Sequence, residues 1–178
     1  MPKQSRDLTH PVWDVYDTYR EARLWVIYYS ERLNWYKGLN FYIEIVLAIT
    51  TSSSAVAILW FWNTPLGQEV WKYIVVVSAL LAVIKPIIKI TEKVQRYEEV
   101  LTGYKGLEND LKMIVVQIKQ SNKYGTIHRT KLLEVMTRQG ELLQRSPEAK
   151  PEERLHNKCK LQVTKELPAE HFFVPKGK

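Results

Sequence analysis

The polar residues best suited to chemistry lie within apolar sequence. A run of hydroxyl residues, TTSSS at positions 50–54, falls in the stretch from Ile45 to Trp62, which carries no charge. Hydroxyl groups at membrane depth either line a wet path or let neighbouring helices pack closely. Successive helical residues turn by about 100°, so five of them do not form one clean stripe. Both interpretations stay open, and we take Thr51 and Ser54 as candidate pore-lining residues.

Charged residues border the apolar stretches. Glu44 lies one turn inside the first stretch, and Lys85 directly precedes Pro86 in the second. In a tight hairpin of the two stretches, Glu44 is expected near Lys89, one turn from Lys85. A charge at the bilayer centre costs about 2.5–3.5 kcal/mol, and less near an interface or in a pair. Because proline also removes a helical hydrogen bond, Glu44, Lys85 and Pro86 are candidates for a cytoplasmic gate. A paired Glu, a snorkelling Lys and simple helix packing would also explain them.

A basic segment extends from residue 112 to residue 145, where only Glu134 and Glu141 oppose the positive charges. Such a segment is usually a solvated face or one drawn to anionic lipid. A nucleotide-type signal is the sharper alternative, although no phosphate-binding motif and no interleaved aromatic residues support it. Nucleic acid is not an expected partner. The candidate residues for binding an anionic ligand or lipid are Lys119, Lys123, Arg129, Lys131 and Arg138.

The sequence carries no motif that is typical of an enzyme. A glycine-rich phosphate loop, a nucleophile elbow, an HExxH pair and a CxxC pair are all absent from it. The single Cys159 excludes an internal disulfide framework and a multi-cysteine zinc site. The four histidines have no ligand spacing. We therefore expect no catalytic residues, no metal site and no cofactor.

Two apolar stretches, residues 41–62 and 70–90, predict a transmembrane hairpin. About 22 helical residues are about 33 Å long, enough to cross a hydrocarbon core of about 30 Å. Proline and glycine in the connection favour a tight turn, and aromatic residues cluster at both ends of the stretches, as they do at membrane interfaces. The 178-residue chain, 46% hydrophobic, is therefore predicted to be an all-α membrane protein. A soluble helical hairpin buried in a large core is the alternative.

Positive charges flank the hairpin on the side of both chain ends, whereas the connection offers only Lys72 beside Glu69. By the positive-inside rule both termini lie in the cytoplasm. The polar first residues do not form a cleavable signal peptide. Cys159 is then expected to react with a membrane-impermeant maleimide in inverted vesicles and not in intact cells. The flanking positive charges are Arg20, Arg23, Arg32, Lys37, Lys89, Lys93 and Arg96.

The regions outside the hairpin are predicted to be helical. Residues 1–40 form an amphipathic N-terminal helix, 91–145 a cytoplasmic helical region resembling a coiled coil, and 146–178 a C-terminal extension. Apolar residues recur at alternating spacings of three and four in two seams, a pattern typical of coiled coils. Since the seams leave the hairpin on one side, they can pair with each other and with neighbouring copies, and we expect a cyclic homo-oligomer. The first seam is Val12, Val15, Tyr19, Ala22, Val26, Tyr29, Leu33 and Tyr36. The second is Ile90, Val94, Tyr97, Leu101, Tyr104, Glu108, Leu111, Val115 and Ile118.

Local signals refine this picture. Gly103 and Gly106 either weaken the second seam helix or let another helix approach closely. A turn at 121–125 precedes a shorter helix at 126–145, and a linker follows at 146–151. Cys159, Leu161 and Val163 alternate with polar residues, which predicts a short strand. The FFV cluster at residues 172–174 is expected to dock on a surface that the sequence does not specify.

An amphipathic helix carrying YSERL at residues 29–33 leads into the two-span hairpin, and a long helix carrying RYEEVL at 96–101 follows it. This order resembles the SLATT family of small bacterial two-span membrane proteins, over residues 12 to about 120. SLATT proteins are regarded as pore-forming or membrane-disrupting effectors of anti-phage defence, often encoded beside nucleotide-signal synthases. The resemblance implies a triggered ion channel in the bacterial inner membrane, with a nucleotide-type signal or a signal-producing protein as candidate partner. It implies no catalytic residues. A non-conducting anchor that scaffolds a cytoplasmic coiled coil, and an accessory transporter subunit, are the alternatives.

Overall fold

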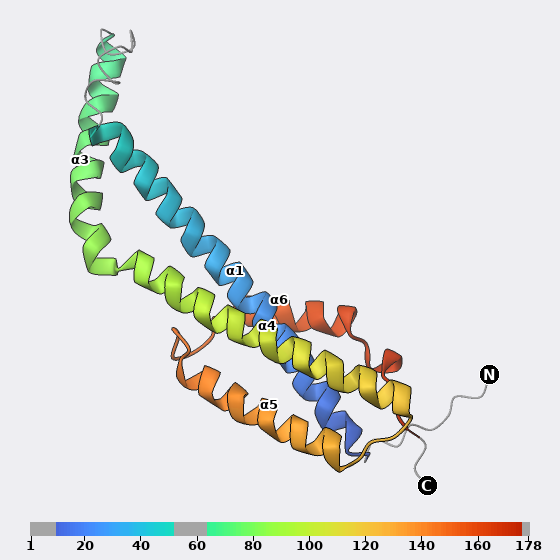
Figure 1. Ribbon diagram of the computed structural model, residues 1–178. Helices are drawn as coiled ribbons and strands as arrows, with labels where there is room; N and C mark the ends of the chain where they lie inside the picture. Colours follow the sequence, from blue (N-terminus) through green and yellow to red (C-terminus); the bar gives the residue numbers. More distant parts are fainter. Residues whose placement is uncertain (1–9, 52–63, 176–178) are drawn as a thin grey trace. The chain divides into compact units, whose positions relative to one another are not determined.

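The computed structural model describes residues 10–51 and 64–175, and every regular element within these two ranges is a helix (Figure 1). The all-α prediction is therefore confirmed. Contacts divide the chain into two units: the first comprises residues 1–32 and 96–178, and the second comprises Leu33–Gln95. The elements in chain order are α1 (Val12–Thr51), α3 (Pro65–Ile88), α4 (Ile90–Ser121), α5 (Thr126–Gln144), α6 (Glu153–Glu166) and the 3-10 helix η2 (Ala169–His171).

The two seams form the core of the first unit, where α1 and α4 pack against each other. Val12, Val15, Ala22, Tyr104 and Leu111 are all fully buried. Aromatic rings bridge the two helices: the ring of Tyr29 on α1 stacks on that of Tyr104 on α4, with centroids 5.5 Å apart. The predicted pairing of the seams is thus confirmed within one chain. Because the seams are covered in this way, they no longer argue for contact with neighbouring copies.

The polar member of the second seam has a partner in the first. Glu108 forms an ion pair with Arg23 at 3.3 Å, and Arg23 also forms an ion pair with Glu166 of α6 at 2.9 Å. One guanidinium therefore connects α1 with α4 and with α6. Hydrogen bonding and attraction to Glu166 and Glu108 raise the pKa of Arg23, although burial, the largest single influence, acts in the opposite direction.

Helix α5 approaches α4 closely at Gly103. A Cβ placed on Gly103 of α4 would lie 2.9 Å from Cδ1 of Leu142 on α5, and nearer still to Cδ2. A Cβ on Gly106 would meet no atom within 4 Å. From the sequence, these glycines either weaken α4 or let another helix approach it closely. Of the two, Gly103 alone lies where another helix approaches. Helix α5 itself matches the prediction for residues 126–145.

The predicted strand around Cys159 is wrong, because these residues belong to α6. Cys159 and Val163 are buried, whereas Leu161 between them has 66% of its surface exposed. Residues four apart share one face of a helix, and a residue two positions away lies on the other side. The alternation of apolar and polar residues thus reflects one buried pair and one exposed leucine. Glu153 in the first turn and Lys165 in the last also suit the helix dipole.

The second unit contains α3 and the C-terminal part of α1. Thr64 caps α3, since its Oγ1 accepts a hydrogen bond from the Gly67 N–H at 3.1 Å, and Pro65 occupies the first turn. The helix ends at Lys89, which adopts a left-handed conformation with φ 51°. Residues 52–62 of the predicted first span lie outside the described residues.

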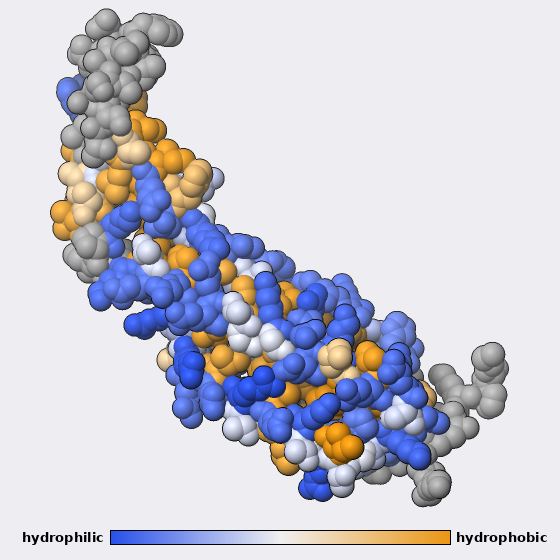
Figure 2. All heavy atoms as spheres, viewed as in Figure 1, coloured by the Kyte–Doolittle hydropathy of each residue, from blue (hydrophilic) through white to orange (hydrophobic). Residues whose placement is uncertain are grey.

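Large apolar side chains cover the surface of the second unit (Figure 2). Within residues 10–51 and 64–175, no one helix has the length and apolar character to span a bilayer, whereas the bent pair Lys72–Lys85 and Ile90–Ser121 meets both criteria. The exposed large apolar residues are Trp35, Phe41, Tyr42, Ile45 and Ile49 on α1, and Val70, Tyr73, Val76, Val77, Leu80, Val83 and Ile84 on α3.

Candidate functional site

Two of the predicted gate residues are in contact. Lys85 of α3 donates to Oε1 of Glu44 on α1 at 3.3 Å, and Asn40 donates to the same oxygen at 2.9 Å. The sequence predicted Lys89 beside Glu44, whereas the observed partner is Lys85, one helical turn earlier. That expectation fails because Lys89, the left-handed cap that follows α3, directs its ammonium group to Glu92 of α4 at 3.1 Å.

The other gate and pore candidates are less completely described. Thr51 is the last residue of α1, and Ser54 lies outside the described residues. Pro86 is a residue of α3, which ends two residues later at Ile88. A proline has no N–H for the carbonyl one turn before it, so α3 loses one helical hydrogen bond shortly before its end.

The basic candidates do not form one cluster of free cations. Arg138 contacts Asp110 of α4 at 2.6 Å, and Lys131 donates to the Gln117 side chain at 3.1 Å. Asp110 lies just before the basic segment of residues 112–145, so the sequence analysis did not count it among the opposing charges. The side chains of Lys119, Lys123 and Arg129 are exposed, and none makes a hydrogen bond or ion pair with another described residue.

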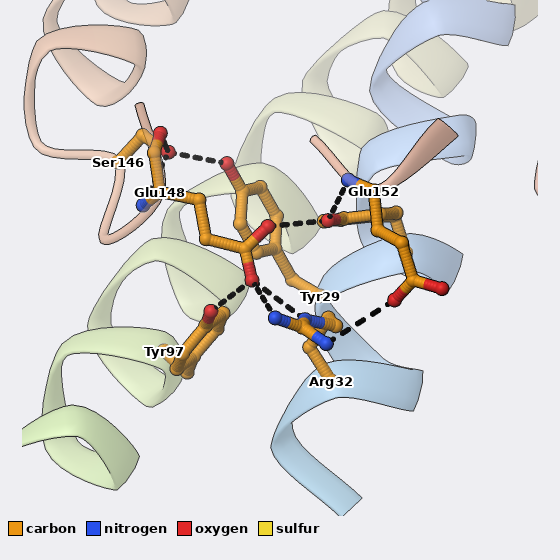
Figure 3. A network of polar contacts seen from close by, with 7 residues as sticks. Tyr29, Arg32, Tyr97, Ser146, Glu148 and Glu152 are labelled. Atoms are coloured by element: carbon orange, nitrogen blue, oxygen red, sulfur yellow. Dashed lines mark hydrogen bonds and ion pairs between the residues drawn. The ribbon is translucent and has the colours of Figure 1, made fainter. Parts of the chain in front are cut away.

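A buried polar cluster that the sequence analysis did not predict holds the first unit together (Figure 3). At its centre is the carboxylate of Glu148, which lies in the connection between α5 and α6. Oε1 of Glu148 accepts hydrogen bonds from Nε of Arg32 at 2.6 Å and from the Tyr97 hydroxyl, and it also forms an ion-pair contact with Nη2 of the same guanidinium. Oε2 accepts a hydrogen bond from the Tyr28 hydroxyl. We call Tyr28, Arg32, Tyr97 and Glu148 the Glu148 clasp.

Three elements position the clasp. Tyr28 and Arg32 are four residues apart on α1 and share one face, Tyr97 lies on α4, and Glu148 follows α5. Two further hydrogen bonds fix the connection: the Tyr28 hydroxyl accepts from the Glu152 N–H at 2.9 Å, and the Ser146 and Tyr29 hydroxyls are 3.0 Å apart. The clasp therefore ties α1, α4 and the α5–α6 connection into one structure.

Electrostatics favour the charged form of Arg32 at the centre of the clasp. The side chains of Arg32 and Glu148 are mostly buried. Burial lowers the pKa of Arg32, but its hydrogen bond and attraction to Glu148 outweigh this effect and raise the pKa. Burial and the hydrogen bond to Glu148 raise the pKa of Tyr28. Both carboxylate oxygens are already engaged, Oε1 by Arg32 and Tyr97 and Oε2 by Tyr28. The clasp is thus suited to holding helices together.

The sequence did contain a signal for this cluster. Tyr29 and Tyr97 occupy buried seam positions, and a buried tyrosine hydroxyl usually needs a hydrogen-bond partner. The segment read as a linker carries one carboxylate, Glu148, between Pro147 and Pro151. Prolines restrict such a segment, so it can hold that carboxylate in place.

The C-terminal residues dock on the N-terminal part of α1. The Tyr16 hydroxyl donates to the Phe173 carbonyl at 2.6 Å, and the Tyr16 ring stacks on that of Phe172 with centroids 4.2 Å apart. The expected docking of the FFV cluster is confirmed, and its surface is the N-terminal part of α1.

Among the described residues, no group of three or more His, Cys, Asp or Glu side chains could hold a metal ion. No family model, curated protein or solved structure matches this chain. The resemblance to SLATT proteins therefore depends on the residues quoted for it.

Proposed function

We propose that this protein is an oligomeric, pore-forming effector of the bacterial inner membrane, triggered in anti-phage defence. In this proposal residues 41–62 and 70–90 cross the membrane, and both termini are cytoplasmic. The observation that carries the proposal is the Glu44–Lys85 ion pair, which lies on a unit whose surface is otherwise rich in exposed apolar side chains. Such a surface favours lipid over water, and intramembrane charges commonly mark ion pathways.

The proposed path follows the face of α1 that carries Glu44 and Thr51. These residues are seven positions, or about two turns, apart on one helix. Lys85 and Pro86 belong to the cytoplasmic mouth. Polar groups are needed there because bare hydrocarbon walls expel water and hold no ion.

Currents through purified protein in planar bilayers test this function, with the trigger supplied once it is known. Replacing Thr51 by Leu should reduce or block conductance while the oligomer stays intact. Reversing Glu44 or Lys85 should change the charge preference of the current. Lys72→Gln is a matched control, because Lys72 pairs with Glu69 in the connection and should leave selectivity unchanged. Equal currents for the wild type and Thr51→Leu would remove Thr51 from the path, and a complete lack of current in triggered protein would contradict the pore.

One observation favours a second function. The first unit has its own buried core and its own polar clasp, so it could act as a cytoplasmic scaffold that the hairpin merely anchors. Expression in cells distinguishes the two functions, since a pore should depolarise the membrane and an anchor should not.

A further inference from the structure

A groove with an acidic rim runs between the N-terminal part of α1 and helix α5. Its volume is about 760 Å³. Three carboxylates of α1, those of Asp14, Asp17 and Glu21, form one rim, and they share a helix face because they are three and seven residues apart. Leu133 and Met136 of α5 line the groove with 56% and 49% of their surface exposed.

The carboxylates at the rim of the groove are not paired with other described residues of the chain. The side chains of Asp14, Asp17 and Glu21 are exposed, and none makes a hydrogen bond or ion pair within residues 10–51 and 64–175. Arg129 is the cation among the lining residues, so the rim keeps an excess of negative charge. A complementary surface should therefore present cations around an apolar side chain.

Helix α6 presents such a surface on its outer side. Arg154, Lys158 and Lys165 surround the exposed Leu161, at a shallow hollow of about 520 Å³. With about 3.6 residues per turn, these four residues point away from Cys159 and Val163, which are buried. The spacing also fits, because Lys158 and Lys165 are seven residues apart, as are Asp14 and Glu21.

Helix α6 cannot fill the groove of its own chain. Its inner side is held on α1 by the Arg23–Glu166 ion pair at 2.9 Å and by a hydrogen bond from Arg20 to the Thr164 hydroxyl at 3.4 Å. The basic face therefore remains available to another molecule.

We propose that α6 of one copy docks in the acidic groove of a second copy. Leu161 then packs on Leu133 and Met136, while Lys158 and Lys165 face Asp14 and Glu21. This inference rests on the proposed function only for the expectation that copies associate in one membrane. The two surfaces differ, so the contact is heterologous and repeats around a ring if the rotation closes. A ring of this kind gives an oligomer in which every copy uses the same contact.

Charge reversal of the full chain tests the contact by mass measurement in nanodiscs. Both Lys158→Glu/Lys165→Glu and Asp14→Lys/Glu21→Lys should convert the oligomer to monomers, because like charges then meet. The chain with all four changes should assemble again, and so should an equimolar mixture of the two double variants. Lys105→Glu/Lys112→Glu is the matched control, since it reverses two exposed α4 lysines at the same spacing and should leave the oligomer intact. Circular dichroism of each variant verifies that the helices are retained.

The alternatives give different results. An oligomer that survives both double reversals overturns this contact and leaves the pore proposal standing. Loss of association with the α6 reversal alone, without the groove reversal, also overturns it and assigns the basic face to anionic lipid. A wild-type monomer that conducts overturns the contact and the oligomeric part of the proposed function, while the pore itself stands. Assembly that follows the expected charge pattern without any current supports the contact and contradicts the pore.

Discussion

Arg32 contacts a single carboxylate oxygen of Glu148, a residue 116 positions further along the chain, through two of its nitrogens. The pair joins the last turn of α1 in the first unit to a connection that has no regular structure of its own. The side chains are mostly buried, so removing the Glu148 charge leaves Arg32 in a poorly solvated place with the longer contact to the Glu152 carboxylate, at 3.4 Å.

Glu148→Gln should therefore lower the free energy of unfolding by about 1.5–3 kcal/mol, the size typical of losing hydrogen bonds to a charged group. Chemical denaturation of the full chain in detergent measures this. Glu141→Gln is the control, because Glu141 is exposed on α5 and should change stability by less than about 0.5 kcal/mol. Equal effects of the two substitutions would show that the clasp contributes little.

Two tyrosines of α4 should respond to phenylalanine in opposite directions. Tyr97→Phe removes a hydrogen bond to Glu148 and should cost about 1.5–3 kcal/mol, as for bonds to charged groups. The Tyr104 hydroxyl is buried and has no hydrogen-bond partner among the described residues. Tyr104→Phe should consequently stabilise the protein by about 1 kcal/mol. A loss of stability in Tyr104→Phe would indicate that a bound water satisfies this hydroxyl.

The two glycines of α4 should also differ. Gly106→Ala adds a methyl group in open space and should stabilise the helix by about 0.5–1 kcal/mol. Gly103→Ala forces Leu142 to move, which should cancel that gain and cost about 1 kcal/mol or more. Adding Leu142→Ala to Gly103→Ala makes room for the methyl group, so a double-mutant cycle should give a favourable coupling energy. Additivity of the two substitutions would place α5 further from α4.

Alkaline solution should destabilise the first unit. Burial raises the pKa of Tyr28, Tyr29 and Tyr104 above their ordinary value. Their contribution is complete below a pH of about 10 and is lost as the pH rises, because the unfolded chain then releases protons that the folded chain keeps. Each group adds a slope of up to about 1.4 kcal/mol per pH unit in this range. Unfolding midpoints from pH 8 to 11 should show a smaller slope in Tyr104→Phe than in the wild type.

Labelling of Cys159 will not report topology as the sequence suggested. The thiol is buried in α6, and burial raises its pKa, so that less of the reactive thiolate is present. We expect no maleimide reaction in intact cells or in inverted vesicles until the protein is unfolded. A chain with Cys159→Ala and Lys123→Cys places the thiol on an exposed residue. It should react in inverted vesicles only, and reaction in intact cells would contradict cytoplasmic termini.

The sequence predicted those parts of the fold in which one helix face repeats over many turns. Seam residues such as Val15, Tyr104 and Leu111 recur often enough to identify both the helices and their buried faces. The pattern around Cys159 covers only a few residues. Because the exposed Leu161 falls between the buried Cys159 and Val163, apolar and polar residues alternate there as they do in a strand. Short patterns are ambiguous for this reason.

Contacts between distant residues were predicted less well. The Glu44–Lys85 pair was missed by one turn, because its register depends on where α3 ends, and the left-handed Lys89 ends it. Glu148 was missed since its partners lie more than 50 positions away, and no local periodicity connects a carboxylate in a proline-flanked segment to tyrosines on two helices.

The discontinuous first unit also constrains how the protein is made. A ribosome releases residues 33–95, the whole of the second unit, before the rest of α4, and before α5 and α6. The seam of α1 must therefore stay uncovered while most of the chain is synthesised, and Tyr16 waits for Phe173, 157 residues later, to complete its contacts. Contacts over such distances in sequence form late and slowly. A nascent chain that stops before residue 146 can bury part of its α1 seam against α4 and α5, but it has no carboxylate to close around Arg32.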